Sequence, residues 1–372
     1  MFSNEVAVDP TVKALPAGSV VSVTDAGGML LGTAQFNPHT LIAARVLDTA
    51  ADVAVDEGFF TGRLARALKM RDTLYPRPFY RLIHAEADGL PGMVIDRYDD
   101  VCVVQPNTAG MQAALPLIAA ALTSLLKPRA IVLRGDSPAR GLEGLAEDVR
   151  LFAGTLDGPV RVEENGAVFN ADLIGGQKTG WFFDQRDNRA FMASLSKGAT
   201  VVDFYTHTGG FAIAAAKAGA VHVTAVDRSQ HALDLAAAAA TENGVADRFT
   251  VTRGEVYGVL EQAASRGETW QVVIADPPAF VKSKKDLKAS LQGYRKLARL
   301  CAAATAPGGW LFIASCSHNA PLEEFSAAVA RGLHDAGRAG RIVKTSGAGA
   351  DHPVHPMLPE SAYLKALTFA LD

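Results

Sequence analysis

The sequence has few cysteines and no long apolar run. Three cysteines in 372 residues, Cys102, Cys301 and Cys316, are too few and too scattered for a disulfide framework, which indicates free thiols in a reducing cytoplasm. No apolar run reaches the ~18 residues that a membrane-spanning helix needs. The N-terminus has no basic segment followed by an apolar one. We therefore expect neither a membrane span nor a secretory signal.

The chain also has little net charge. The formal charge is −3, which excludes a strongly basic protein that coats nucleic acid but permits a local basic patch. Hydrophobic residues make up 49% and charged residues 20%, so general disorder is excluded. The nine histidines show no metal-site spacing with cysteine, and His352-Pro-Val-His355 is flanked by prolines. We expect a loop there and no metal.

Two smaller domains are predicted before residue 178. Residues 1–65 contain short β-rich runs separated by turns, which predicts a small β-barrel. Residues 71–177 contain three strand-like runs, an apolar helix over 111–126 and a further strand-like run at 130–134. This order fits an α+β domain.

The pattern changes at residue 178 to strands that alternate with helices. This alternation predicts an α/β fold over 178–372, with a parallel sheet covered by helices on both faces. One of these helices is expected over 291–304, stopped by Pro307-Gly308-Gly309.

A glycine pair, Gly209-Gly210, stands between a predicted strand over 200–204 and a predicted helix. Glycines there let a ligand approach the backbone, although a tight turn without a ligand has the same pattern. Asp227 ends the next predicted strand, where an acid can accept hydrogen bonds from both hydroxyls of a ribose. The alternative for Asp227 is an N-cap of the following helix.

Asp276-Pro277-Pro278-Ala279-Phe280 follows another apolar strand, over 270–275. Two prolines remove two backbone N–H donors. The backbone carbonyls and the Asp276 carboxylate remain as acceptors for the polar edge of a nucleobase. An NAD-dependent dehydrogenase also uses an acid at the position of Asp227, but it has no need of this Asp-Pro-Pro motif. The alternative is a plain Pro-Pro turn.

Cys316 follows the strand over 310–315, at the same predicted sheet edge as Asp276. A lone cysteine is usually a small buried hydrophobe, but this position makes a nucleophile plausible. A basic run begins two residues after Phe280, the end of this motif, and it suits phosphate contacts unless it is a solvated face. Its members are Lys282, Lys284, Lys285, Lys288, Arg295 and Lys296.

Together these motifs resemble class I S-adenosylmethionine (SAM)-dependent methyltransferases. More closely, the chain is similar to the bacterial 23S ribosomal RNA cytosine-C5 methyltransferases of the RlmI group. The resemblance covers nearly the whole chain. It rests on residues 81–98, 176–189, 208–211, 276–280, 315–317, 351–359 and 363–365.

The resemblance implies a Rossmann-like methyltransferase domain, preceded by a PUA-like barrel and a central α+β domain, and a homodimer. SAM is the implied cofactor, and 23S ribosomal RNA is the implied substrate. Asp227 would hold the ribose, and a loop that includes Phe182 and Gln185 would close over the cofactor. The residues expected around the methionine end are Phe204, Thr206, Gly209 and Gly210.

By the same likeness, Cys316 would attack C6 of the cytosine so that C5 can take the methyl group. Asp276 would hold the base, assist the proton steps and contact the cofactor. The base would leave its stack to reach them. The other residues expected to bind substrate are Pro277, Pro278, Phe280, Lys282, Lys284 and Lys285.

The sequence departs from the family pattern in two places. Gly254-Glu255 stands where the family has Gly-Asp, and the Glu255 carboxylate is still expected to accept from the adenine amine. The family's barrel opens with a His-Pro-Trp stretch that Met1–Glu5 lacks, which leaves open whether the first strand is present.

Other functions remain open on the sequence alone. An N-methyltransferase acting on guanine N2 or adenine N6 also uses an Asp-Pro-Pro-aromatic motif, but has no need of Cys316. An RNA-binding scaffold with an inactive methyltransferase domain would have lost its affinity for SAM. The sequence identifies neither the target nucleotide nor the base that takes the C5 proton.

Overall fold

The computed structural model describes residues 1–281 and 286–372, which form two compact units. The first unit comprises Met1–Val160, Asp172–Trp181 and Ala350–His355. The second comprises Arg161–Ala171, Phe182–Gly349 and Pro356–Asp372. These units follow from internal contacts, and the domain borders at residues 65, 71 and 177 stay predictions.

A small antiparallel sheet begins the first unit, after the short helix α1 (Pro10–Lys13). Its order is β1 (Ser19–Thr24), β2 (Leu30–Phe36) and β3 (Ala44–Asp48). The β1–β2 turn forms because Asp25 Oδ1 accepts hydrogen bonds from the N–H groups of Gly27 and Met29, at 2.9 and 2.8 Å. The sequence predicts three or four strands in this region, and the sheet has three.

A five-stranded sheet forms the rest of the first unit, in the order β4-β5-β6-β7-β8. The strands are β4 (Phe79–His84), β5 (Met93–Tyr98), β6 (Val101–Pro106), β7 (Ala130–Gly135) and β8 (Asp148–Gly154). Helices α2 (Glu57–Leu74) and α4 (Leu115–Leu126) share one apolar core with this sheet. The helix predicted over 111–126 is two helices, since α3 (Ala109–Ala113) ends before α4 begins and Pro116 lacks the N–H needed to continue it.

A seven-stranded sheet organises the second unit, in the order β13-β12-β11-β14-β15-β17-β16. Strands β11 to β15 pair with one another in parallel, whereas β17 is antiparallel to both β15 and β16. The bounds are β11 (Thr200–Phe204), β12 (His222–Asp227), β13 (Phe249–Arg253), β14 (Trp270–Ala275), β15 (Thr305–Ser315), β16 (Gly340–Ser346) and β17 (Lys365–Leu371). This arrangement confirms the predicted α/β class.

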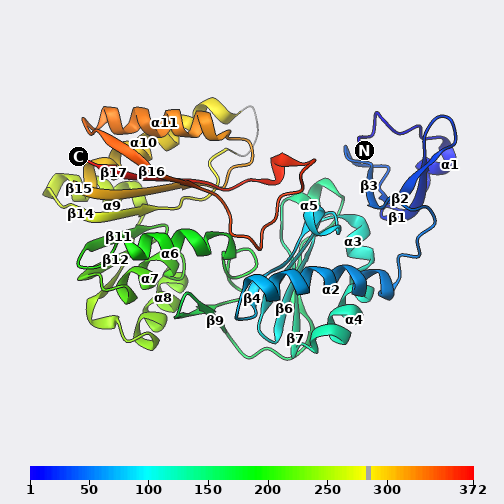
Figure 1. Ribbon diagram of the computed structural model, residues 1–372, viewed down its shortest axis with the longest axis horizontal. Helices are drawn as coiled ribbons and strands as arrows, with labels where there is room; N and C mark the ends of the chain where they lie inside the picture. Colours follow the sequence, from blue (N-terminus) through cyan, green and yellow to red (C-terminus); the bar gives the residue numbers. More distant parts are fainter. Residues whose placement is uncertain (282–285) are drawn as a thin grey trace. The chain divides into compact units, whose positions relative to one another are not determined.

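Helices cover both faces of this sheet (Figure 1). One face packs against α9 (Val256–Arg266), α10 (Leu287–Ala304) and α11 (Leu322–Asp335). The other packs against α6 (Arg186–Ser194), α7 (Gly210–Lys217) and α8 (Gln230–Glu242). The central strands are buried on both faces, so their sequences are continuous apolar runs. A hairpin, β9 (Val160–Glu164) and β10 (Ala167–Ala171), contacts α8 through β10.

The end of α10 differs from the prediction. The helix does end at Ala304, but Pro307-Gly308-Gly309 does not stop it, because β15 already begins at Thr305 and contains these residues. Thr305 pairs with Trp270 and Trp310 with Val272, so the intervening residues form a bulge. Gly308 takes a φ of +73° there, which explains the glycine.

The sequence did not indicate β13, α9 or β16. Strand β13 is short and half polar, and β16 lies at an edge with most of its residues exposed, so neither has the apolar run of a central strand. Among residues 1–281 and 286–372, no helix is long and apolar enough to cross a membrane.

Candidate active site

The predicted functional residues of the second unit follow parallel strands at one edge of the sheet. The carboxyl ends of β11, β12, β13, β14 and β15 share this edge because the strands are parallel and in register. The order changes direction at β11, which has β12 on one side and β14 on the other. Ligands of open α/β sheets bind at such a switch point.

The loop after β11 has an unusual backbone held by one carboxylate. Tyr205, His207 and Gly209 all have positive φ angles, of 63°, 53° and 85°. Asp203 Oδ2 accepts hydrogen bonds from the Thr206 hydroxyl at 2.6 Å and from the N–H of Ala212 at 3.0 Å. These bonds join the loop to the first turn of α7.

Asp203 is itself an unusual carboxyl group, and its role was not predicted from the sequence. Its side chain is buried, and its Oδ1 atom has no hydrogen-bond partner within the protein. Burial raises the pKa of Asp203 to about 7, and the charges of Asp276 and Asp227 act in the same direction. A buried acceptor of this kind suits a polar ligand beside the loop. The feature of the sequence that could have indicated this role is an acid near the end of an apolar strand.

Asp227 ties the end of β12 to the same loop. Its Oδ2 accepts from the N–H of His207 at 3.0 Å, and its Oδ1 accepts from the N–H of Ser229 at 2.9 Å. The N-cap of α8 is Ser229, whose hydroxyl accepts from Ala232 N–H at 3.3 Å. The N-cap alternative for Asp227 is therefore wrong. Its half-buried carboxylate retains lone pairs for a further donor.

The other predicted residues of this loop contribute mainly through backbone. The Phe204 ring is fully buried and packs edge-on against Trp270, with ring centroids 6.2 Å apart, so only the Phe204 backbone reaches the sheet edge. Thr206 and Gly210 are also buried. A Cβ at Gly209 would lie 3.0 Å from Ala236 and from Ile213, so glycine also allows α7 and α8 to pack closely.

The turn with Phe182 and Gln185 precedes α6 and touches the glycine loop. The Phe182 ring lies edge-on to His207, with centroids 5.1 Å apart. Gln185 is buried, and its Oε1 accepts from Asn188 Nδ2 at 2.7 Å. Behind the turn, Arg189 donates to both Glu164 oxygens, at 2.6 and 2.8 Å, and to the Phe182 carbonyl at 2.8 Å.

Glu255 lies at the N-cap of α9, directly after β13. Its side chain is exposed and makes no capping bond. The neighbouring Gly254 N–H donates to the Asp227 carbonyl at 3.0 Å, which places the ends of β12 and β13 together. Two carboxylates thus follow adjacent strands.

The Asp-Pro-Pro-Ala-Phe segment follows β14. Asp276 is half-buried, Pro277 is buried and Pro278 is exposed. The Phe280 ring stacks on Tyr294 with centroids 4.7 Å apart, and Ser290 Oγ donates to the Phe280 carbonyl at 2.8 Å. Phe280 therefore anchors the segment to α10.

Hydrogen bonds hold the turn around Cys316, at the end of β15, from several sides. The Tyr294 hydroxyl lies 2.7 Å from Ser315 Oγ and 3.0 Å from Ser317 Oγ. Ser317 Oγ also accepts from the N–H of Val281 at 3.2 Å, and Lys365 Nζ donates to the Ser317 carbonyl at 2.8 Å. Residues of α10 and β17 therefore hold the turn in place, and the sequence analysis did not predict that these two elements meet there.

Cys316 differs from the other two cysteines. Cys102 and Cys301 are fully buried, and burial raises the pKa of the Cys102 thiol to about 12. Burial also raises the pKa of Cys301. Cys316 is half-buried, and its Sγ lies 4.0 Å from the Pro277 carbonyl oxygen. The nucleophile candidate and the Asp-Pro-Pro segment are therefore adjacent.

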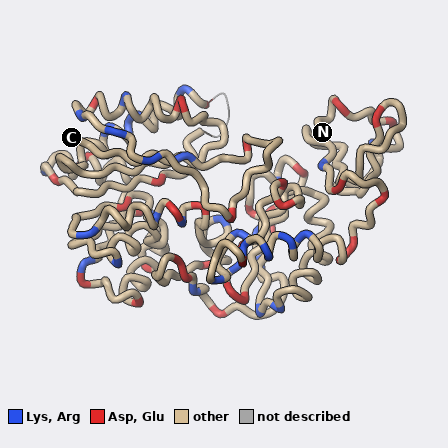
Figure 2. Tube along the Cα trace, in the orientation of Figure 1, with Lys and Arg blue, Asp and Glu red and all other residues tan. Residues whose placement is uncertain are grey.

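The predicted basic run is only partly described. Lys282, Lys284 and Lys285 lie outside the described residues. Arg295 forms an ion pair with Asp335 at 2.6 Å, and Lys296 one with Glu261 at 3.3 Å. Cations and acids both occur along α10 and α11 (Figure 2). The described part of the run is thus partly neutralised.

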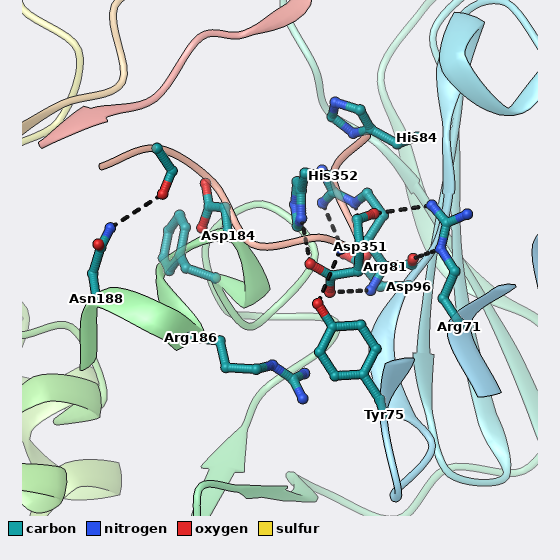
Figure 3. Close-up of polar contacts among 12 residues, drawn as sticks. Arg71, Tyr75, Arg81, His84, Asp96, Asp184, Arg186, Asn188, Asp351 and His352 are labelled. Carbon is teal, nitrogen blue, oxygen red and sulfur yellow. Dashed lines mark hydrogen bonds and ion pairs between the residues drawn. The ribbon is translucent and has the colours of Figure 1, made fainter. Parts of the chain in front are cut away.

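A buried polar cluster lies in the first unit around Asp351 and His352 (Figure 3). The Asp351 carboxylate accepts from Arg81 N–H at 3.0 Å and contacts His352 Nδ1 at 2.8 Å, while Arg71 donates to the Asp351 carbonyl at 2.9 Å. Within the two described ranges, no group of three or more histidines, cysteines or acids could hold a metal ion. Asp351 therefore ties its segment to α2 and β4 of the same unit.

Comparisons with known proteins identify the family of the chain. A family model of S-adenosylmethionine-dependent methyltransferases matches residues 150–369, and a model of a PUA-like domain matches residues 1–49. The first match covers more than half of the chain. The protein is thus a SAM-dependent methyltransferase with an N-terminal PUA-like domain.

Full-length relatives narrow the assignment. A ribosomal RNA large subunit methyltransferase I from Aeromonas hydrophila is 38% identical over 356 residues, which cover 94% of this chain and 90% of the relative. The protein of the same name from Pseudoalteromonas atlantica is 36% identical and covers 97% of this chain and 92% of its own length. The chain therefore belongs to the ribosomal RNA large subunit methyltransferase I family.

Solved structures share the fold at lower identity. A SAM-dependent methyltransferase structure from Streptococcus mutans aligns with a TM-score of 0.81 and 21% identity, over 95% of this chain and 92% of that one. A methyltransferase complexed with S-adenosylhomocysteine aligns with a TM-score of 0.82, also at 21% identity and with the same coverage.

Proposed function

We propose that this enzyme methylates C5 of a cytosine in RNA, and that this RNA is 23S ribosomal RNA. The observation that carries the proposal is the position of Cys316, a half-buried thiol at the carboxyl edge of the sheet, 4.0 Å from the carbonyl oxygen of Pro277. The printed names of the relatives, which cite large-subunit ribosomal RNA, support the substrate.

The edge formed by β11, β12 and β13 fits SAM. The donor hydroxyls of a ribose match the Asp227 carboxylate, and the adenine amine matches the exposed carboxylate of Glu255. The unpartnered Oδ1 of Asp203 supports a polar group beside the loop that contains Thr206. The remaining residues proposed to contact the cofactor are Phe204, through its backbone, Gly209, Gly210, Phe182, Gln185 and Asp276.

The chemistry requires a nucleophile, because an aromatic carbon attacks electrophiles poorly. The Cys316 thiolate adds to C6 and forms a C6–S bond, which makes C5 nucleophilic. SAM, when bound, supplies the methyl group as an electrophile. A base then removes the C5 proton, the C6–S bond breaks, and Cys316 leaves as a thiolate. Asp276 binds the polar edge of the cytosine and assists the proton transfers.

The substrate side is formed by the segment after β14. Pro278 is exposed, and Pro277 offers a carbonyl but no donor. Phe280 holds this segment against Tyr294. Phosphate contacts are assigned to Lys282, Lys284 and Lys285, and the target base would have to leave its stack.

The cellular compartment and the oligomeric state of the enzyme are proposed from other observations. Three free cysteines support a reducing cytoplasm. The family resemblance supports a homodimer, which light scattering at several protein concentrations would test.

A trapping experiment tests the mechanism. RNA with 5-fluorocytidine at the target has no C5 proton to lose, so the adduct with Cys316 should persist after methyl transfer and run as a covalent complex on a denaturing gel. Cys316→Ala should abolish the complex, whereas Cys301→Ala, which alters a buried cysteine of α10, should retain it. Methylation of ordinary RNA by Cys316→Ala would favour an amine methyltransferase. Absence of SAM binding in calorimetry would favour a scaffold.

A further inference from the structure

The proposed reaction needs Cys316 as a thiolate, and an ordinary cysteine thiol has a pKa of ~8.5. Cysteine nucleophiles are usually activated by a nearby cation, a helix N-terminus or an adjacent base. Cys316 follows a strand, so no helix begins at it. The question is which group near this turn can favour the charged form.

Lys365 lies at the right place. It is the first residue of β17 and pairs with Ser315, the last residue of β15. Its Nζ donates a hydrogen bond to the carbonyl of Ser317, the residue after Cys316, at 2.8 Å. Lys365 therefore pairs with the residue before Cys316 and forms a hydrogen bond with the residue after it.

Among the described residues, other titratable groups near the turn are a tyrosine, an acid and a histidine. Tyr294, from α10, is neutral at ordinary pH, and burial raises its pKa further. Asp276, before Pro277, is an acid that would oppose a thiolate. His318 lies on the turn itself, and its ring stacks on Tyr363 with centroids 5.2 Å apart.

The charges of Lys365 and Cys316 also influence each other. Burial lowers the pKa of Lys365, while the negative charge of an ionised Cys316 raises it. The same electrostatic attraction favours the thiolate form of Cys316. Partial burial strengthens this effect, since water screens the pair less than it would at the surface.

We propose that the Lys365 ammonium group stabilises the Cys316 thiolate, so that Lys365 is a positioning and charge-supplying residue for the nucleophile. This inference rests on the proposed function, in which Cys316 attacks the cytosine. In this proposal, the Tyr363-Leu364-Lys365 segment acts on the ionisation of Cys316 and does not contact the RNA directly.

The test measures thiolate formation directly. The rate at which iodoacetamide alkylates Cys316 in the full-length protein, followed by intact mass against pH, gives the thiol's midpoint, because the thiolate displaces iodide and forms the S–C bond. Cys102 and Cys301 are buried, and Cys316→Ala identifies any background. The main variant is Lys365→Gln, which loses the charge but keeps a donor for the Ser317 carbonyl.

We expect Lys365→Gln to raise the midpoint by about one pH unit, which slows alkylation near neutral pH about tenfold. Lys365→Arg should keep the midpoint near that of the unchanged protein. Lys344→Met, which alters a lysine of β16 above the Phe191 ring, should leave it unchanged.

Equal midpoints in Lys365→Gln and the unchanged protein would overturn the proposal, as would a Lys365→Arg profile that matches Lys365→Gln. Lys365→Met provides a second neutral variant if the glutamine protein is unstable. Alkylation requires neither RNA nor SAM, so a failure of this proposal is distinguishable from a failure of the proposed reaction.

Discussion

The Asp203 carboxylate accepts a 2.6 Å hydrogen bond from the Thr206 hydroxyl. This bond joins a buried strand end to a loop in which Tyr205 and His207, on either side of Thr206, both have positive φ. Non-glycine residues rarely adopt that conformation and do so where the surroundings enforce it. Asp203 is thus central to the shape of the proposed cofactor loop.

Asp203→Asn should change how stability depends on pH. Burial raises the pKa of Asp203 from 3.8 to about 7, so between these values the folded chain holds a proton that the unfolded chain has lost. The contribution of this group to stability is present below pH 4 and is lost as pH rises towards 7. An asparagine does not titrate, so the variant should lack this loss, which amounts to about 1.4 kcal/mol per pH unit.

Urea unfolding at several pH values between 4 and 8 measures the effect. Asp247→Asn, at an exposed position, is the control and should follow the unchanged protein. Parallel stability curves for Asp203→Asn and the unchanged protein would contradict the assignment.

Asp227→Asn should weaken SAM binding. The substitution removes a charge proposed to accept ribose hydroxyls, and charge-assisted hydrogen bonds are worth ~1.5–3 kcal/mol, or about 10- to 100-fold in the dissociation constant. Calorimetry with SAM measures this change. Asp234→Asn, on the exposed face of α8, is the matched control. An unchanged affinity in Asp227→Asn would remove Asp227 from the cofactor site.

Tyr294→Phe should disturb the turn that carries Cys316. The hydroxyl contacts both Ser315 and Ser317, and all three side chains are buried. Leaving two buried hydroxyls short of a partner costs ~1–3 kcal/mol in the free energy of unfolding. We expect that loss in urea titrations, together with slower methylation at saturating SAM. Tyr257→Phe, on α9, removes a longer 3.3 Å bond and should have less effect on both.

Glu164→Gln should destabilise the second unit. Arg189 is buried and donates to both Glu164 oxygens, and removing one partner of a buried ion pair costs ~3–5 kcal/mol. Glu242→Gln alters an exposed pair with Arg161 and should cost less than ~1 kcal/mol. Thermal unfolding compares the two variants. Equal effects would show that the Glu164 pair does not stabilise the turn at Phe182.

The residues of the glycine loop and the strand ends were predictable from the sequence because they follow apolar strands in chain order. Parallel pairing then requires Asp227, Asp276 and Cys316 to share an edge. The Phe204 side chain was less predictable, because it points into the core and packs on Trp270. Alternation along a strand buried on both faces does not reveal which face a ring will take.

Lys365 and Tyr294 could not be found from the sequence by position alone. Each reaches Ser315 or Ser317 only because β17 inserts between β15 and β16 and because α10 packs under β14 and β15. Such partners depend on sheet order, which local patterns do not determine. The bulge at Pro307-Gly308-Gly309 was missed for a similar reason, since glycine and proline mark bulges as well as helix ends.

The most direct test of the central claim is the identity of the methylated nucleoside. The protein is incubated with SAM and unmodified large-subunit ribosomal RNA, and the RNA is digested and analysed by mass spectrometry. The account predicts 5-methylcytidine, formed by the unchanged protein and absent with Cys316→Ala. Methylated guanosine or adenosine, formed by both proteins, would contradict it.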